Sequence, residues 1–439
     1  MKRERLDGLY LLLLGTIPVF LLLSFLFVTN SPNPMKDFKS SYYSARCLLQ
    51  HCDPYRESEV LRIYQAEGVD YPLDDAKDRV AATRYVYPPT VFSFTIPFAM
   101  LPWKMARILW IMLTAGSLLI ASLLAWDLGA DYAPILSGVL IGHLLANSEV
   151  LMILGNPSGI AISLCVVAVW CFHRERFVFA GILCFAVSLA VKPQEAGLIW
   201  LYFLLAGGIH RKRALQTLLA TFVLSLPGLL WAWRISPNWM QELHHNVLAF
   251  AAHGEINDPG PSSNWAHGLV DLQVVISFFR DDPHFYNPVS YFICAMLLLV
   301  WVLVTLRASP STAKIWLAIA AIAPLTLLPV HHHLYDTKLL LLTVPACAML
   351  WAEGGLTGRL ALLVNAAGFV LTGDISWAIL FCLINYFKMH TAGYVERMLA
   401  VMGVVPGPLI LLVMGVFYLW VYARRGSQTG EREDACFVA

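Results

Sequence analysis

Charged residues are scarce in this 439-residue chain. Only 13% of the residues are Asp, Glu, Lys or Arg, whereas 58% are hydrophobic and the mean hydropathy is +0.65. A soluble protein could not hide that much apolar surface. The formal net charge is only +1, and the positive residues are dispersed at segment ends, which gives no support to a nucleic-acid partner. The composition predicts an all-α polytopic membrane protein.

Several common signatures are also missing. The chain has no H-E-x-x-H or H-x-x-E-H metal motif, no Gly-rich phosphate loop and no evident internal repeat. Seven of the nine cysteines lie in or beside apolar segments or in the C-terminal tail, so they form no disulfide framework. Cys47 and Cys52 are close in sequence in a polar loop, where a local disulfide and two free thiols are both open alternatives.

Long apolar runs predict about 11–13 transmembrane helices, because each run approaches the roughly 30 Å hydrocarbon thickness of a bilayer. The first run is long enough to be a retained helix rather than a signal peptide, and the basic residues before it place the N-terminus in the cytoplasm. The segment at 90–102 is interpreted as re-entrant or half-spanning. The predicted spans are 9–28, 106–125, 133–153, 158–172, 177–191, 195–209, 214–233, 289–306, 313–330, 338–352, 357–372 and 403–422, with less regular apolar segments at 90–102 and 375–387.

Basic clusters orient these spans. The clusters at 173–176, 210–213 and 307–314 are expected in the cytoplasm. The polar junctions between the other helix ends then share the outer face with the loop that follows the first helix. These outer segments are 30–89, 155–159, 191–197, 234–288 and 331–336. We predict one integral membrane domain over 1–425, followed by a flexible tail at 426–439.

Two of the outer loops, 30–89 and 234–288, are too long to be simple connectors. In the first, apolar residues fall on one helical stripe, which predicts a helix lying in the membrane interface with its apolar face down. The second contains NWMQELHHNVLAFAAH at 238–253, which predicts an amphipathic helix. The stripe in the first loop consists of Phe38, Tyr42, Ala45, Leu48 and Leu49.

Candidate functional residues gather in these outer segments. Asp37 fits either a helix N-cap or a general base for a hydroxyl acceptor. Arg84 and Tyr87, in RYVYPPT, fit either interfacial anchors or ligands of a lipid head group. Lys192 and Gln194, in VKPQE, lie at a helix start, where a cation favours phosphate binding over simple snorkelling.

The stretch HHHLYD at 331–336 first suggests a metal site. In a helix, three consecutive histidines point in three directions and cannot all reach one ion. His331, His332, Tyr335 and Asp336 therefore fit an oxyanion or a sugar hydroxyl better, with water-facing histidines as the alternative. We expect that His331 or His332, but not all three histidines, matters for ligand binding.

The order of these motifs resembles glycosyltransferase family 87. The resemblance rests on DFKSSYYSARCLLQHCDPY, YPPTVFSFTIPFAMLP, a Gly-Asn junction, KPQ and the His/Tyr/Asp cluster, in that order over about 9–345. It implies the membrane-embedded C-type glycosyltransferase fold and a polyprenyl-phosphate-mannose-dependent mannosyltransferase. It further implies that Asp37 is the catalytic base and that the other motifs line the donor site. The family junction commonly reads Gly-Gln-x-Asn, whereas this chain has Gly155-Asn156-Pro157, which leaves open the role of Asn156 in substrate binding.

The expected activity is transfer of a hexose, mannose by resemblance, from a polyprenyl-phosphate sugar to a hydroxyl of a glycolipid or polysaccharide, with inversion. The site is expected to face the periplasm or cell exterior from the plasma (inner) membrane. The candidates for stabilising the departing lipid phosphate are Lys192, His331, His332, Arg84 and Tyr335. No cofactor is expected, although a divalent metal stays open. The alternative is a lipid or glycolipid transporter or flippase, which needs charged residues through the depth of the bilayer.

Overall fold

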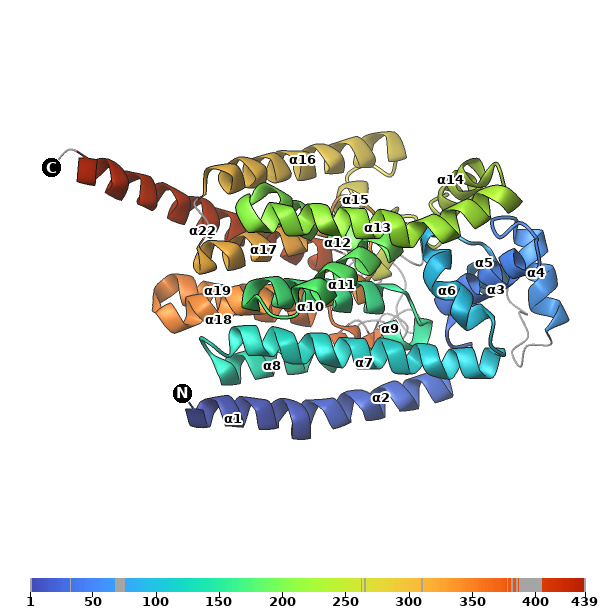
Figure 1. Ribbon diagram of the computed structural model, residues 1–439, viewed down its shortest axis with the longest axis horizontal. Coiled ribbons are helices and arrows are strands. Elements are labelled where there is room, and N and C mark those ends of the chain that lie inside the picture. The colour runs from blue at the N-terminus through green and yellow to red at the C-terminus, as the bar shows by residue number, and fades with distance from the viewer. Residues whose placement is uncertain are drawn as a thin grey trace.

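The computed structural model is a bundle of helices that run along its longest axis, with shorter helices gathered at the end away from the N-terminus (Figure 1). The structure describes the chain except for residues 1, 32, 68–75, 262, 264–265, 309–310, 377, 380–381, 384–385, 387–404 and 438–439. No strand occurs among the residues described, and the one isolated bridge joins Leu269 to His333. The all-α prediction is confirmed.

Six segments of the described chain are long and apolar enough to cross a membrane. On four of them, large apolar side chains such as Leu14, Phe25, Met112, Phe222 and Phe292 are exposed on the outside of the bundle, as lipid contact requires, whereas the segment Leu334–Glu353 is almost wholly buried. The six segments are Arg3–Asn30 (α1 Lys2–Tyr10, η1 Leu11–Thr16 and α2 Ile17–Asn30), α7 (Trp103–Gly129), α13 (Gly208–Ile235), α16 (Pro283–Arg307), Leu334–Glu353 (η4 Leu334–Thr343 and α18 Val344–Glu353) and Pro406–Arg425 within α22 (Pro406–Phe437).

Shorter helices complete the bundle. Three of them, η2 (Pro89–Val91), α8 (Pro134–Leu145) and α12 (Pro193–Leu205), start at a proline, whose missing N–H costs nothing in the first turn of a helix. The shorter apolar helices are η2 and α6 (Pro89–Val91 and Phe92–Ala99), α8 (Pro134–Leu145), α10 (Ser158–Arg174), α11 (Val178–Val191), α17 (Thr312–Thr326) and α19 (Gly355–Leu371). The remaining helices are α3 (Lys36–Leu49), α4 (Glu57–Ala66), α5 (Ala76–Thr83), α9 (Glu149–Leu154), α12 (Pro193–Leu205), α14 (Trp239–Phe250), η3 (Ala266–Gly268) and α15 (Leu272–Ser277).

The segment predicted to be half-spanning is short in the structure. Helix α6 has 8 residues and contains Pro97, so it extends only about 12 Å. Of the 13 residues of the other irregular segment, 375–387, six lie outside the described residues. Helix α22 continues through most of the segment 426–439.

The predicted cytoplasmic segments meet at the end of the bundle that carries the N-terminus. Arg5, near the start of the chain, contacts Asp127 at 2.7 Å, and Arg174 contacts the same carboxyl group at 2.9 Å. Arg213 of the second basic cluster contacts Glu175 of the first at 3.2 Å. The basic clusters at 173–176 and 210–213 therefore lie together with the basic N-terminus.

Helix α3 forms where the apolar stripe predicted it, but its surroundings differ from the prediction. Ten of its residues are buried, including Lys39, Ser40 and Ser41 on the polar side. The rings of Trp103 and Trp110 stack on Phe38 with centroid separations of 5.6 and 4.3 Å. Helix α3 therefore packs inside the protein rather than on the lipid surface, because α4, α5 and α6 cover it.

The histidine segment also differs from the helical geometry that was considered for it from the sequence. Residues 331–333 form no helix, His333 has an extended backbone, and η4 begins only at Leu334. The backbone N–H of Val270 donates to the His332 carbonyl at 2.8 Å. The loop at 234–288 thus pairs with the histidine segment, through this hydrogen bond and the isolated bridge between Leu269 and His333.

Candidate active site

The junctions predicted to be outer converge on one cavity, which we call the central cavity. Its volume is about 190 Å³, and it lies between α3, the residues before η2, the start of α10, the α11–α12 junction, α14 and the histidine segment. Segments far apart in the sequence therefore line a common space. The polar residues that line it are Asp37, Ser40, Arg84, Tyr87, Asn156, Lys192, Gln194, Asn257, His331, His333, Tyr335 and Asp336.

Asn156 connects the polar groups of this cavity. Its Nδ2 amide group lies 2.6 Å from Asp37 Oδ2, 3.1 Å from the Tyr87 hydroxyl and 3.0 Å from the Tyr335 hydroxyl. Its Oδ1 accepts a hydrogen bond from the backbone N–H of Ser158 at 2.9 Å, so that the amide nitrogen, and not the oxygen, points at the carboxylate. Asn156 therefore holds the Asp37 carboxylate in one orientation.

Asp37 is the second residue of α3 rather than its N-cap, which is Met35. Burial raises the pKa of the Asp37 carboxyl to about 6, although the Asn156 hydrogen bond and the charge of Lys192 both act to lower it. A carboxylate with a pKa just below neutrality is ionised at pH 7 and still basic enough to accept a proton from a hydroxyl. Its burial and its hydrogen bond to Asn156 make Asp37 a candidate for a general base.

Lys192 lies between α11 and α12 and is buried against two carboxylates. Its Nζ is 2.8 Å from Asp336 Oδ1 and 2.6 Å from Glu195 Oε1, and it also contacts the Ser158 hydroxyl. Burial by itself would lower the pKa of Lys192, but the Asp336 and Glu195 charges outweigh that cost and raise it. Lys192 is therefore a charged group that already lies against Asp336 and Glu195, not a free cation.

The histidines divide between the cavity and the protein interior. His331 is exposed to the cavity, and desolvation by the surrounding protein, together with the charge of Lys192, lowers its pKa. His333 also lines the cavity, where its Nε2 is 3.1 Å from Asn257 Oδ1 and its ring stacks on Tyr335. His332 is buried, and its Nδ1 lies 2.9 Å from the Val330 carbonyl. His331 is thus the histidine with a free face toward a ligand.

The structure brings nearly all the predicted residues together. Asp37, Arg84, Tyr87, Asn156, Lys192, Gln194, His331, Tyr335 and Asp336 line the central cavity, whereas His332 does not. Arg84 is engaged by Glu57, whose Oε2 is 2.9 Å from its Nη2.

Some contributors were missed by sequence reasoning. Ser158 and Glu195 stand within GNPSG and VKPQE, so the motifs carried a signal for them. His333 was not among the predicted site residues, because the prediction assumed a helical geometry for the histidine segment. Asn257 lies in a long loop and had no local signal at all.

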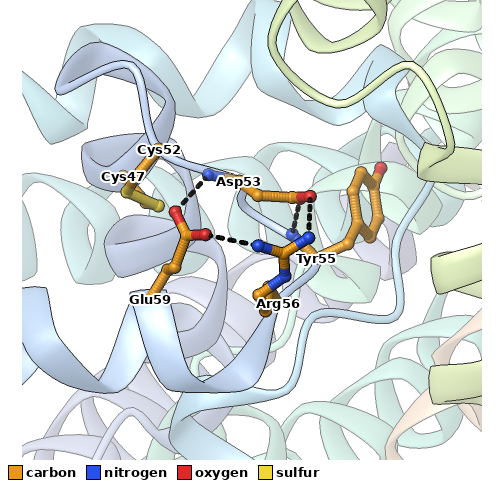
Figure 2. Close-up of a disulfide and its surroundings, with 6 residues drawn as sticks. All are labelled: Cys47, Cys52, Asp53, Tyr55, Arg56 and Glu59. Carbon is orange, nitrogen blue, oxygen red and sulfur yellow. Dashed lines mark hydrogen bonds and ion pairs between the residues drawn. A yellow bond between two sulfur atoms is a disulfide. The ribbon is translucent and has the colours of Figure 1, made fainter.

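A metal site has limited support in the part of the chain that the structure describes. The one group of three potential ligand atoms close enough to share an ion there consists of Cys47, Cys52 and Glu59. The two cysteines are joined as a disulfide in this structure (Figure 2), so their sulfurs are not thiolate ligands. Asp37 and Asp336 belong to no such group.

Comparison with known families agrees with this arrangement. The family model of glycosyltransferase family 87 matches residues 85–313, just over half of the chain. The chain belongs to glycosyltransferase family 87. Neither a curated protein nor a solved structure matches it.

Membership in family 87 makes the protein a membrane glycosyltransferase, with a sugar donor and an acceptor as its substrates. The matched range contains Tyr87, Asn156, Lys192 and Gln194. Asp37 and the histidine segment lie outside it, and only the folded chain brings them to the matched residues.

Proposed function

We propose that this glycosyltransferase moves a hexose, mannose by family resemblance, from a polyprenyl-phosphate sugar to a hydroxyl of a glycan or glycolipid acceptor at the outer face of the plasma membrane. The observation that carries the proposal is the Asp37 carboxylate, held by Asn156 in a cavity that also contains an exposed imidazole. A general base and an imidazole that can bind phosphate, in one cavity at the end of a membrane bundle, suit a lipid-phosphate donor.

In the proposed reaction, Asp37 accepts the proton of the acceptor hydroxyl as that oxygen attacks the anomeric carbon. The new bond joins the acceptor oxygen to the anomeric carbon, and the bond between that carbon and the phosphate oxygen breaks. The products are the glycosylated acceptor, a protonated Asp37 and the free polyprenyl phosphate. Attack from the face opposite the phosphate inverts the anomeric configuration.

The leaving phosphate gains negative charge and needs hydrogen-bond donors or cations. His331 is suited to this role, because its side chain reaches the cavity and the described residues offer it no hydrogen-bond partner. The Tyr87 hydroxyl is a second donor, since burial raises its pKa well above the usual value and keeps it protonated. Lys192 adds positive potential, although Asp336 and Glu195 neutralise much of it.

The disulfide supports the proposed orientation. Cys47 lies in the last turn of α3 and Cys52 just after that helix, at the end of the bundle that carries the central cavity. Disulfides persist in oxidising compartments such as the periplasm and the cell exterior, and are rare in the cytosol. The arginine cluster at the opposite end agrees with the same orientation, because cytoplasmic ends are rich in Arg and Lys.

The direct test uses purified protein with polyprenyl-phosphate mannose, and compares wild type with Asp37→Asn. We expect the variant to stay folded and bind donor, but to transfer sugar about 100- to 10,000-fold more slowly. Undiminished transfer would rule out Asp37 as the base. The glycolipids and polysaccharides of a deletion strain, compared with those of its parent, would identify the missing hexose and the acceptor.

A further inference from the structure

A second cavity, which we call the side cavity, adjoins the central cavity. Its volume is about 410 Å³, and Arg84 lines both cavities. Helix α14 also contributes to both, with Gln241, Glu242, His245 and Asn246 in the side cavity and Val247 and Phe250 in the central one. The proposed reaction uses only residues of the central cavity, so it assigns no function to the side cavity. The other residues that line it are Tyr55, Arg56, Glu57 and Ser58.

Three side chains of the side cavity have unused hydrogen-bonding capacity. Ser58, Gln241 and His245 are exposed, and their side chains have no hydrogen-bond partner within the described chain. Together they present a hydroxyl, an amide and an imidazole, which donate and accept hydrogen bonds. A ligand rich in hydroxyl groups, which also donate and accept, matches this set.

The charges of the side cavity are already paired. Arg84 contacts Glu57 at 2.9 Å. Arg56 contacts Glu59 at 3.0 Å, Glu242 at 3.6 Å and Asp53 at 3.9 Å. Both arginines that line the cavity are therefore engaged by carboxylates, which outnumber them. An anionic ligand would find no unengaged arginine here and would face the carboxylates, whereas a neutral ligand meets no such cost.

The walls of the side cavity are fixed relative to the central cavity. The Asn246 amide donates to the carbonyls of Tyr55 and Tyr85 at 2.9 and 3.0 Å, which ties α14 to both loops. Figure 2 shows the Cys47–Cys52 disulfide beside the segment that carries Arg56. Within that segment, the Asp53 N–H donates to Glu59 and the Tyr55 N–H donates to Asp53. The site is thus formed before any ligand binds, which lowers the entropic cost of binding.

From these observations we propose that the side cavity is an acceptor subsite for a neutral oligosaccharide, and this rests on the proposed function. The sugar that receives the hexose lies at Asp37, and the sugar before it lies beyond Arg84, against Ser58, Gln241 and His245. The acceptor is then a neutral glycan of at least two sugar units, free or on a lipid, rather than a single sugar or an anionic head group.

The test measures transfer by the purified full chain to octyl glycosides of one, two and three mannose, glucose or galactose units, and to phosphatidylinositol. We expect KM about tenfold lower for the best two-unit acceptor than for its one-unit counterpart. The double variant Gln241→Ala/His245→Ala should raise the two-unit KM about five- to tenfold, and should leave the one-unit KM and the donor KM unchanged.

The matched control is His244→Ala, which removes an exposed histidine of the same helix that does not line the cavity. Any of four results would overturn the subsite. These are equal KM values for one-unit and two-unit acceptors, a double variant with unchanged KM values, an equal effect of His244→Ala, or a preference for phosphatidylinositol. If folded wild type glycosylates none of the acceptors, the proposed function fails, and binding of mannotriose and maltotriose measured by NMR saturation transfer then decides the subsite. Binding that the double variant loses would support it, and no binding would overturn it.

Discussion

Substitution of Asn156 by alanine tests how the structure tunes Asp37. Asn156 Nδ2 donates to Asp37 at 2.6 Å, and this hydrogen bond lowers the pKa of a carboxyl that burial raises to about 6. A hydrogen bond to a charged group contributes about 1.5–3 kcal/mol, which corresponds to about one to two pH units. Asn156→Ala should therefore make Asp37 harder to ionise.

The assay is the pH dependence of kcat/KM for sugar transfer. The general base must be ionised, so wild-type activity should fall as the pH drops through about 6. In Asn156→Ala the acidic limb of the profile should move upward by about one to two pH units. Much of the lost activity should then return at alkaline pH.

A matched control separates this effect from a general loss of packing. Asn365 is also a buried asparagine, but it hydrogen-bonds to Thr343 and Tyr418, which do not line the central cavity. Asn365→Ala should lower thermal stability and leave the acidic limb in place. An unmoved limb in Asn156→Ala would refute the assignment, because the hydrogen bond would then not control the ionisation of the base.

Three other predictions follow from the same geometry. His331→Ala should raise the donor KM about tenfold, whereas His332→Ala should change stability but not donor KM; equal effects on KM would contradict the placement of these side chains. Lys192→Met should destabilise the protein by about 3–5 kcal/mol, because it leaves buried carboxylates without a cation, and Asp336→Asn in the same chain should restore part of that loss in thermal unfolding. Reduction of the Cys47–Cys52 disulfide should cost about 2 kcal/mol, as expected for so short a loop, and an unchanged Tm in reductant would show that the bond contributes nothing.

The sequence alone predicted the all-α membrane fold, because hydrophobic runs of this length have few other structures open to them. It also predicted which polar junctions share one end of the bundle, since Arg and Lys mark the cytoplasmic ends. Nine of the ten candidate site residues line one cavity for that reason. Motif order further indicated the family to which the chain belongs.

Only the tertiary structure decided what each of these side chains does. The motif VKPQE by itself predicts that Lys192 is a free cation, but folding places Lys192 against Asp336, which is distant in the sequence. His332 resembles its neighbours in the sequence, yet it is buried and does not line the central cavity, whereas His331 and His333 do. The side cavity has no local signal, because it exists only where α14 meets the loop after α3. Such contacts depend on the path of the chain in space, which residue order does not record.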